Sequence, residues 1–219
     1  MKETIYKYLE RHYKNPNYLY FLVSLLFMLV IPPLAPLIEN GAILFNITYG
    51  LVLFMGAFYT STDSREFAVF LLVGGIVYVL FLNEQTTVYY SLLNAGLTFL
   101  FFSLIFLKLV RYILYSDDID INEIYACVSG YLILGIVAAP LFYLIEQTLG
   151  NAFHLPADYS FYDFIYFSFI TLTSVGYGDI SPIHPFAKAI TIIISIFGQL
   201  YLTILIAIII GKYLASKVK

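Results

Sequence analysis

Residues 171–179 read Thr-Leu-Thr-Ser-Val-Gly-Tyr-Gly-Asp, a stretch in which glycines alternate with larger residues. Glycine adopts backbone angles that other residues avoid. Gly176 and Gly178 therefore allow successive backbone carbonyls to point to one side of the chain. Ser174 lies two residues before Gly176, and its hydroxyl extends the same row of oxygens. The stretch thus predicts a path lined by backbone oxygen atoms.

The flanks of this stretch place it at membrane depth. A short apolar run, residues 161–173, precedes it and a long one, residues 184–212, follows it. The short run cannot cross a bilayer, which takes about 20 apolar residues. Non-helical backbone at membrane depth is tolerated only where protein buries it or where it lines a water-filled cavity. The sequence therefore predicts a re-entrant helix whose negative C-terminal end points toward a cavity.

The composition of the whole chain agrees with a membrane location. Of the 219 residues, 61% are hydrophobic and 11% are charged, whereas a soluble domain is about half apolar and a quarter charged. This balance argues against a soluble enzyme, a nucleic-acid-binding protein and a disordered chain. We expect an all-α integral membrane protein surrounded by lipid, with no nucleic-acid partner.

Six apolar segments are long enough to predict membrane spans, with the glycine stretch between the fifth and sixth. They cover residues 18–38, 41–60, 66–82, 87–114, 122–147 and 184–212. With both termini cytoplasmic, ten of the eleven basic residues fall on the cytoplasmic side and only Lys188 does not. The ten are Lys2, Lys7, Arg11, Lys14, Arg65, Lys108, Arg111, Lys212, Lys217 and Lys219. The positive-inside rule therefore predicts a multi-pass protein of the cell membrane with both termini cytoplasmic.

Residues 160–182, SFYDFIYFSFITLTSVGYGDISP, resemble the pore helix and filter of the tetrameric potassium-channel family. The resemblance is specific over about residues 161–215, and the layout is that of the prokaryotic type with six spans and one pore loop. It implies a K⁺-selective channel with K⁺ ions in the filter and no other cofactor. It does not imply an enzyme. Four filters surround one ion in this family and this chain has one, so the resemblance implies a homotetramer.

The resemblance also assigns residues. It places K⁺ in a filter formed by Ser174, Val175, Gly176, Tyr177 and Gly178, with the ions at the first four of these. It places filter support and the outer mouth at Tyr166, Phe167, Thr173 and Asp179, the two aromatic residues forming a cuff behind the filter. Ser174 departs from the usual Thr, so we expect altered occupancy of the innermost site. Ile170 replaces a Glu that some members link to the filter Asp.

The long helix after the filter is the expected site of gating. Gly198 occupies the position of the family's hinge glycine, where it either permits a bend or allows close packing against a neighbouring helix. Beyond it, Thr203, Ile206 and Ile210 are expected to face the pore axis. Rings of Ile can close a pore by dewetting, so we predict a hydrophobic gate at Ile206 or Ile210.

The first four predicted spans have the layout of a voltage sensor without its charges. The fourth span carries only Lys108 and Arg111, both at its cytoplasmic end, where they are typical membrane anchors. Asp63 and Glu66 are assigned to the inner loop, which leaves no acidic partner for gating charges. We therefore expect weak or no voltage dependence.

These observations predict a division of the chain into three parts. Residues 1–16 are a cytoplasmic segment, and residues 17–115 are the sensor-like bundle. Residues 116–219 are the pore domain. Its parts are the outer helix (122–147), the pore helix (161–173), the filter (174–178) and the inner helix (184–212). The alternative is a nonconducting or regulatory membrane subunit that keeps the filter as a scaffold.

Overall fold

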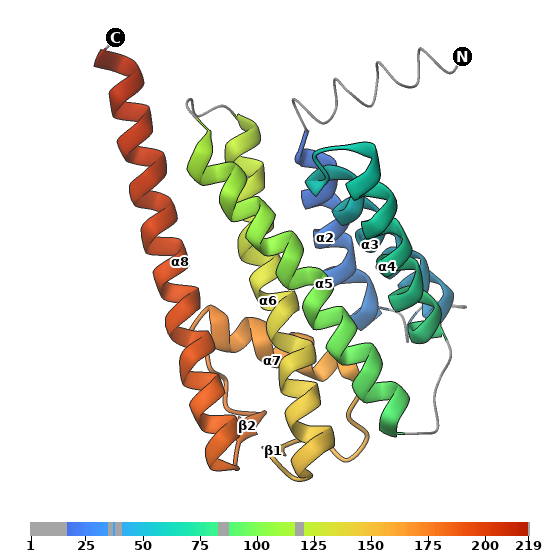
Figure 1. Cartoon of the computed structure of the whole chain (residues 1–219). Helices are drawn as coiled ribbons and strands as arrows, with labels where there is room; N and C mark the ends of the chain where they lie inside the picture. The colour runs from blue at the N-terminus through green and yellow to red at the C-terminus, as the bar shows by residue number, and fades with distance from the viewer. Residues whose placement is uncertain (1–16, 35–36, 38–40, 83–87, 117–120, 219) are drawn as a thin grey trace. The chain divides into compact units, whose positions relative to one another are not determined.

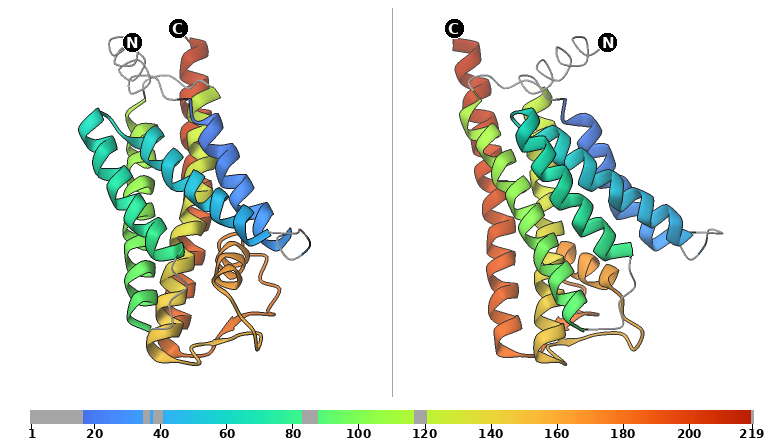
Figure 2. Two further views of the ribbon diagram at one scale, coloured as in Figure 1. Left: turned by 90° about the vertical axis from the view of Figure 1, so that its right-hand side faces the viewer. Right: turned by 45° about the vertical axis from the view of Figure 1, so that its right-hand side comes forward.

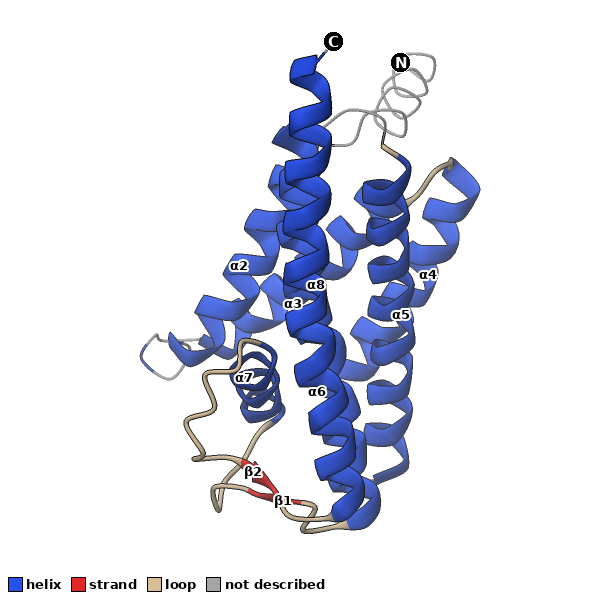
Figure 3. Cartoon of the chain, turned by 90° about the vertical axis from the view of Figure 1, so that its left-hand side faces the viewer, coloured by secondary structure: helices blue, strands red, loops and turns tan. Residues whose placement is uncertain are grey.

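The computed structural model describes residues 17–34, 37, 41–82, 88–116 and 121–218. Its helices are α2 (Leu19–Leu34), α3 (Gly41–Thr60), α4 (Ser64–Leu82), α5 (Val88–Tyr115), α6 (Ile121–Leu149), α7 (Phe161–Leu172) and α8 (Pro185–Val218). Two short strands, β1 (Phe153–His154) and β2 (Ser181–Pro182), form the sheet in this part of the chain. Figure 3 shows that the rest is almost entirely helical. The all-α architecture predicted from the sequence is therefore confirmed.

Five of the described helices are long and apolar enough to cross a membrane. The qualifying segments are Ile43–Thr60, Ser64–Leu82, Tyr89–Tyr115, Ile121–Leu149 and Pro185–Ile208. The predicted first span begins as expected, but α2 has 16 residues, fewer than the roughly 20 that a span needs. Residues 35–36 and 38–40, most of which the sequence assigned to that span, lie outside the described residues.

The chain divides into two compact units, each described here by itself. Unit 1 contains residues 1–84 and 104–130, and unit 2 contains residues 85–103 and 131–219. Helices α5 and α6 therefore contribute residues to both units. This division rests on backbone proximity and does not test the functional boundary expected at residue 116, which stays a prediction.

In unit 1, α2 packs against α3 and α3 packs against α4 (Figure 2). Phe21 and Leu25 are completely buried. Gly56 allows a close approach in this core, because a Cβ there would lie 2.6 Å from Cδ1 of Ile105. Large apolar side chains on the outer faces stay exposed, among them Val69 and Leu72. Such faces suit a lipid environment better than water.

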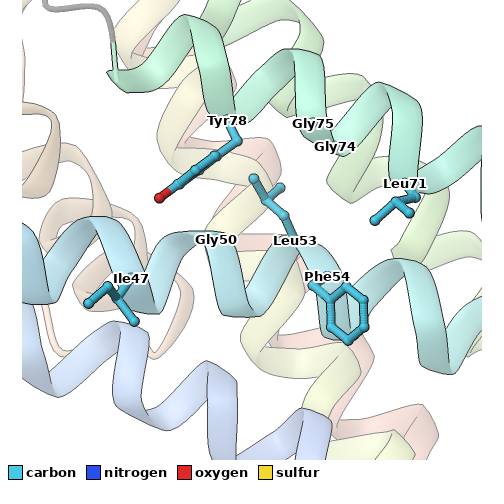
Figure 4. Close-up of a pocket in the computed structure, with 8 residues that line it drawn as sticks. All are labelled: Ile47, Gly50, Leu53, Phe54, Leu71, Gly74, Gly75 and Tyr78. Carbon is cyan, nitrogen blue, oxygen red and sulfur yellow. The ribbon is translucent and has the colours of Figure 1, made fainter.

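Helices α3 and α4 leave a groove of about 390 Å³ between them. Figure 4 shows that apolar side chains and three glycines line it. The ring of Tyr78 covers Gly50, where an added Cβ would lie 3.0 Å from the ring. Glycine therefore determines how closely this ring approaches α3.

The ion pair of Lys108 corrects the expectation that the charges of the fourth predicted span have no acidic partner. Its ammonium group pairs with Glu66, donates to the Thr60 carbonyl at 3.1 Å and lies 5.4 Å from the centre of the Phe70 ring. Glu66 belongs to the first turn of α4 and not to the preceding loop. The Thr62 backbone N–H also donates to it at 2.7 Å. The charge on α5 therefore has an acidic partner that the sequence analysis missed.

In unit 2, α7 packs against α8, and the strand pair lies near the start of α8 (Figure 1). Pro185 begins α8, where its fixed φ favours the first turn and its missing N–H costs nothing. The strands are antiparallel and pair Phe153 with Pro182 and His154 with Ser181. This pairing joins the segment before α7 to the segment that follows residue 179.

Candidate functional site

Helix α7 is the short helix that precedes the glycine stretch. Its first turn is stabilised by Asp163, whose carboxylate accepts the Ser160 backbone N–H at 2.7 Å and the Ser160 hydroxyl at 3.0 Å. A carboxylate at a helix N-terminus also complements the helix dipole. The helix ends at Leu172, one residue before the predicted end. Its C-terminal carbonyls are therefore next to residues 173–178.

Positive φ recurs at every second residue of the stretch 174–178. Ser174, Gly176 and Gly178 have φ values of 59°, 56° and 83°, whereas Val175 and Tyr177 are not among the positive-φ residues. Alternating left- and right-handed residues turn successive N–H groups to one side, and the carbonyls then face the other. All five residues are exposed in the isolated chain. This geometry suits cation coordination by carbonyl oxygens.

The cost of this conformation falls mainly on Ser174. A side-chain-bearing residue in the left-handed region is strained by about 1–2 kcal/mol. Its N–H donates to the Thr171 carbonyl at 3.0 Å. The next two N–H groups, of Val175 and Gly176, both donate to the Ile170 carbonyl, at 3.1 and 3.3 Å. The free carbonyls at the end of α7 thus hold the start of the glycine stretch in place.

A hydrogen bond ties the other end of the stretch to α7. The hydroxyl of Tyr166 donates to Oδ2 of Asp179 at 2.7 Å. This bond raises the pKa of Tyr166 to about 12 and holds the pKa of the Asp179 carboxyl below its usual range. The structure therefore brings together two residues that the resemblance assigned to filter support and to the mouth.

Phe167 and Thr173 contribute in different ways. Phe167 is buried and packs against Phe142 and Phe153, with ring centroids 4.9 and 5.4 Å apart. It thus anchors α7 through an aromatic cluster. The hydroxyl of Thr173 donates to the Phe169 carbonyl at 2.7 Å. That contact turns the Thr173 hydroxyl back toward α7.

Glu146 stabilises the segment that leads into α7. Its carboxylate is buried and accepts the backbone N–H groups of Asn151, Ala152 and Phe153 at 3.0, 2.8 and 3.0 Å. The carbonyl of Ala152 in turn accepts the N–H of Ile183 at 2.8 Å. These bonds join the loop before α7 to the loop that follows the glycine stretch.

Gly198 lies where α8 meets the end of α7. A Cβ at this position would lie 2.5 Å from the Leu172 carbonyl oxygen and 2.8 Å from Cδ1 of Leu172. The same carbonyl accepts the Tyr131 hydroxyl at 3.3 Å. Of the two roles considered for Gly198, close packing is therefore observed. The hinge role stays a prediction.

The predicted gate residues lie farther along α8. Thr203 and Ile206 are exposed in the isolated chain, and the Thr203 hydroxyl donates to the Gln199 carbonyl at 2.8 Å. The side chain of Ile210 lies outside what the structure describes. The structure therefore leaves both gate assignments as predictions.

Sequence reasoning missed one contact of the filter stretch. The Gln199 amide nitrogen donates to the Ser174 hydroxyl oxygen at 2.9 Å, linking α8 to the first residue of the filter. The available signal was an amide side chain in an apolar helix next to a glycine. Its partner, 25 residues away, could be identified only after folding.

Comparison with known proteins finds a family model that matches part of the chain. Residues 130–215 match a protein family described as "Ion channel". The matched region contains most of α6, all of α7, the glycine stretch and most of α8. An ion-channel domain within a set of long apolar helices describes a multi-pass membrane protein.

A curated relative of the chain is named as a potassium channel. The chain is 28% identical over 146 residues to the hyperpolarization-activated voltage-gated potassium channel of Methanocaldococcus jannaschii. The match covers 66% of this chain and 66% of that protein, just under two thirds of its length. No solved structure matches the chain. The resemblance to the potassium-channel family is thereby confirmed.

Proposed function

We propose that the protein is a K⁺-selective channel in which four copies of residues 174–178 surround a single file of ions. The observation that carries this proposal is the positive φ at every second residue of the stretch, Ser174, Gly176 and Gly178. An ordinary loop would have no reason to place a serine in the left-handed region. The strain is offset when carbonyls that face one side of the chain replace the hydration shell of K⁺.

The assembly follows from the number of filters. One chain supplies one such row, and a ring of carbonyls needs several rows around one axis. We therefore propose a homotetramer in membrane lipid. In this arrangement α2 completes six spans, α7 is the re-entrant pore helix, α8 is the inner helix, and both termini are cytoplasmic. The exposure of residues 174–179 in the single chain is the exposure expected of a surface that other subunits complete.

We further propose that membrane voltage controls this channel weakly or not at all. Moving one elementary charge through 100 mV is worth about 2.3 kcal/mol. The charge of Lys108 is paired with Glu66, and Arg111 is one turn farther along α5. The name of the M. jannaschii relative describes voltage-gated opening of that protein. We propose that the present chain differs in this respect.

The alternative is a nonconducting or regulatory subunit that keeps the filter as a scaffold. Flux through purified protein in liposomes separates the two functions. We expect K⁺ uptake driven by a K⁺ gradient, little Na⁺ uptake under matched conditions, and inhibition by Ba²⁺. Liposomes that contain assembled protein but take up neither ion would favour the regulatory subunit.

A further inference from the structure

The Ser174 hydroxyl is held by a donor that belongs to α8. Gln199 Nε2 lies 2.9 Å from Ser174 Oγ. Ser174 also has the only left-handed backbone among the residues of the glycine stretch that carry a side chain. The inner helix therefore contacts the filter at its most strained residue.

The donor itself is fixed in place by its neighbours. Gly198 packs directly on the Leu172 carbonyl, so α8 cannot move here without disturbing the end of α7. The Gln199 carbonyl accepts the Thr203 hydroxyl at 2.8 Å. The amide of Gln199 thus extends from a backbone position that packing determines.

Serine needs such a donor more than threonine would. Two heavy atoms on Cβ make threonine stiff at χ1, whereas the serine hydroxyl can occupy several staggered positions. A hydrogen bond from Gln199 selects one of them. A fixed hydroxyl oxygen holds a cation in a defined site, whereas a rotating one presents its oxygen only part of the time.

We propose that Gln199 is a positioning residue for the innermost cation site of the filter, acting through the Ser174 hydroxyl. This inference rests on the proposed function of the filter. It also gives α8 a direct route to the filter: a movement of α8 at Gly198 changes the Gln199 contact and with it the innermost site.

Block by Ba²⁺ measures this site, because Ba²⁺ is close to K⁺ in size and is held by the same oxygen atoms. The test uses the full chain in planar bilayers, with Ba²⁺ added on the side that the Ser174 end of the filter faces. We expect Gln199→Leu to weaken block by about three- to tenfold, because every subunit loses a neutral hydrogen bond that acts on the ion only through the position of the Ser174 hydroxyl. In a Ser174→Thr background, the same substitution should change block by less than about twofold, because threonine restores the stiffness.

Ser195→Ala is the matched control. Its hydroxyl lies one turn before Gln199 and donates only to the Thr191 carbonyl of its own helix, at 2.9 Å, so block should match that of the wild type. If Gln199→Leu does not assemble, Gln199→Asn shortens the side chain by one methylene and makes the same test.

Three results would overturn the inference. One is a Gln199→Leu channel that conducts K⁺ and is blocked as the wild type is. Another is an equal shift in the wild-type and Ser174→Thr backgrounds, which would place the effect elsewhere. A wild-type protein that passes no K⁺ would remove the proposed function and the inference together. The first two results leave the proposed function intact.

Discussion

Gly176 and Gly178 illustrate how a backbone conformation, rather than a side chain, can form a functional site. Both have positive φ, and a Cβ at either position would meet no atom within 4 Å. Glycine is therefore required at both positions by the backbone angle and not by crowding. The sequence was sufficient to predict these positions, because few residues other than glycine tolerate them.

Substitution of Gly176 by alanine should abolish K⁺ flux. The left-handed conformation costs an alanine about 1–2 kcal/mol in each subunit, and relief of that strain turns a carbonyl out of the row. Flux into liposomes measures the loss. Gly150→Ala is the control, since Gly150 has φ of 63° and equally open surroundings but lies outside the filter. Equal flux in Gly176→Ala and wild type would contradict the assignment.

The Tyr166–Asp179 hydrogen bond should make conduction resistant to acid. The bond lowers the pKa of Asp179, so its contribution is complete above the ordinary Asp pKa and is lost as pH falls through the lowered value. In Tyr166→Phe the carboxyl returns toward its ordinary pKa and takes up a proton at higher pH. A neutral mouth attracts fewer cations.

We therefore expect acid on the Asp179 side to inhibit K⁺ current at a higher pH in Tyr166→Phe than in wild type. Currents recorded over a pH series measure the shift. Tyr143→Phe serves as control, because the Tyr143 ring also packs on α7, against Phe161 and Phe164. Identical pH profiles for Tyr166→Phe and wild type would show that the bond does not govern the mouth.

The conformation of Ser174 and its bond to Gln199 could not be predicted in the same way. Serine has no intrinsic preference for the left-handed region. Its angle results from the carbonyls at the end of α7 and from the inner helix. Contacts between distant parts of the chain determine the conformation of such a residue, and a single sequence gives little information about these contacts.

Helices α7 and α8 meet at Gly198, and this crossing determines where the inner helix stands relative to the filter. The predicted bounds of α7 and the predicted start of α8 lie within one residue of those observed, because apolar length and the flanking Gly and Pro define them. The predicted inner helix ended at residue 212, whereas α8 continues to Val218. The sequence did not decide whether Gly198 acts as a hinge or as a packing contact, because glycine serves either purpose.

Gly198→Ala should destabilise the assembled protein. The added methyl group would overlap the Leu172 carbonyl, and overpacking of this kind costs about 1–3 kcal/mol. The melting temperature of purified protein in detergent should fall. Gly211→Ala is the control on the same helix, with no atom within 4 Å, and there alanine should be neutral or stabilising by up to about 1 kcal/mol. Unchanged melting of Gly198→Ala would contradict the packing role.

The molecule as a whole combines a region that matches an ion-channel family, residues 130–215, with helices that carry few charges. Composition was enough to predict a membrane protein, and the basic residues were enough to propose an orientation. The partner of Lys108 was missed because Glu66 was assigned to the loop, whereas α4 begins early enough to include it. The predicted span began at residue 66 and α4 begins at Ser64, so a difference of two residues at a helix end was enough to hide an ion pair.

Conductance should depend little on voltage. A full charge moved through the field would contribute about 2.3 kcal/mol per 100 mV, and the paired Lys108 should contribute much less. We expect conductance to change by less than about tenfold over 100 mV, since tenfold corresponds to about 1.4 kcal/mol. Lys108→Gln should leave this slope unchanged. A steep conductance–voltage relation that Lys108→Gln flattens would contradict the prediction.

Ion selectivity is the property for which residues 174–178 are proposed, and the reversal potential measures it most directly. Purified protein in a planar bilayer is placed between a K⁺ solution and a Na⁺ solution of equal concentration. The proposed filter predicts a reversal potential strongly displaced from zero, in the direction set by the K⁺ gradient. A reversal potential near zero would mean that K⁺ and Na⁺ pass equally, and it would contradict a selective filter at these residues.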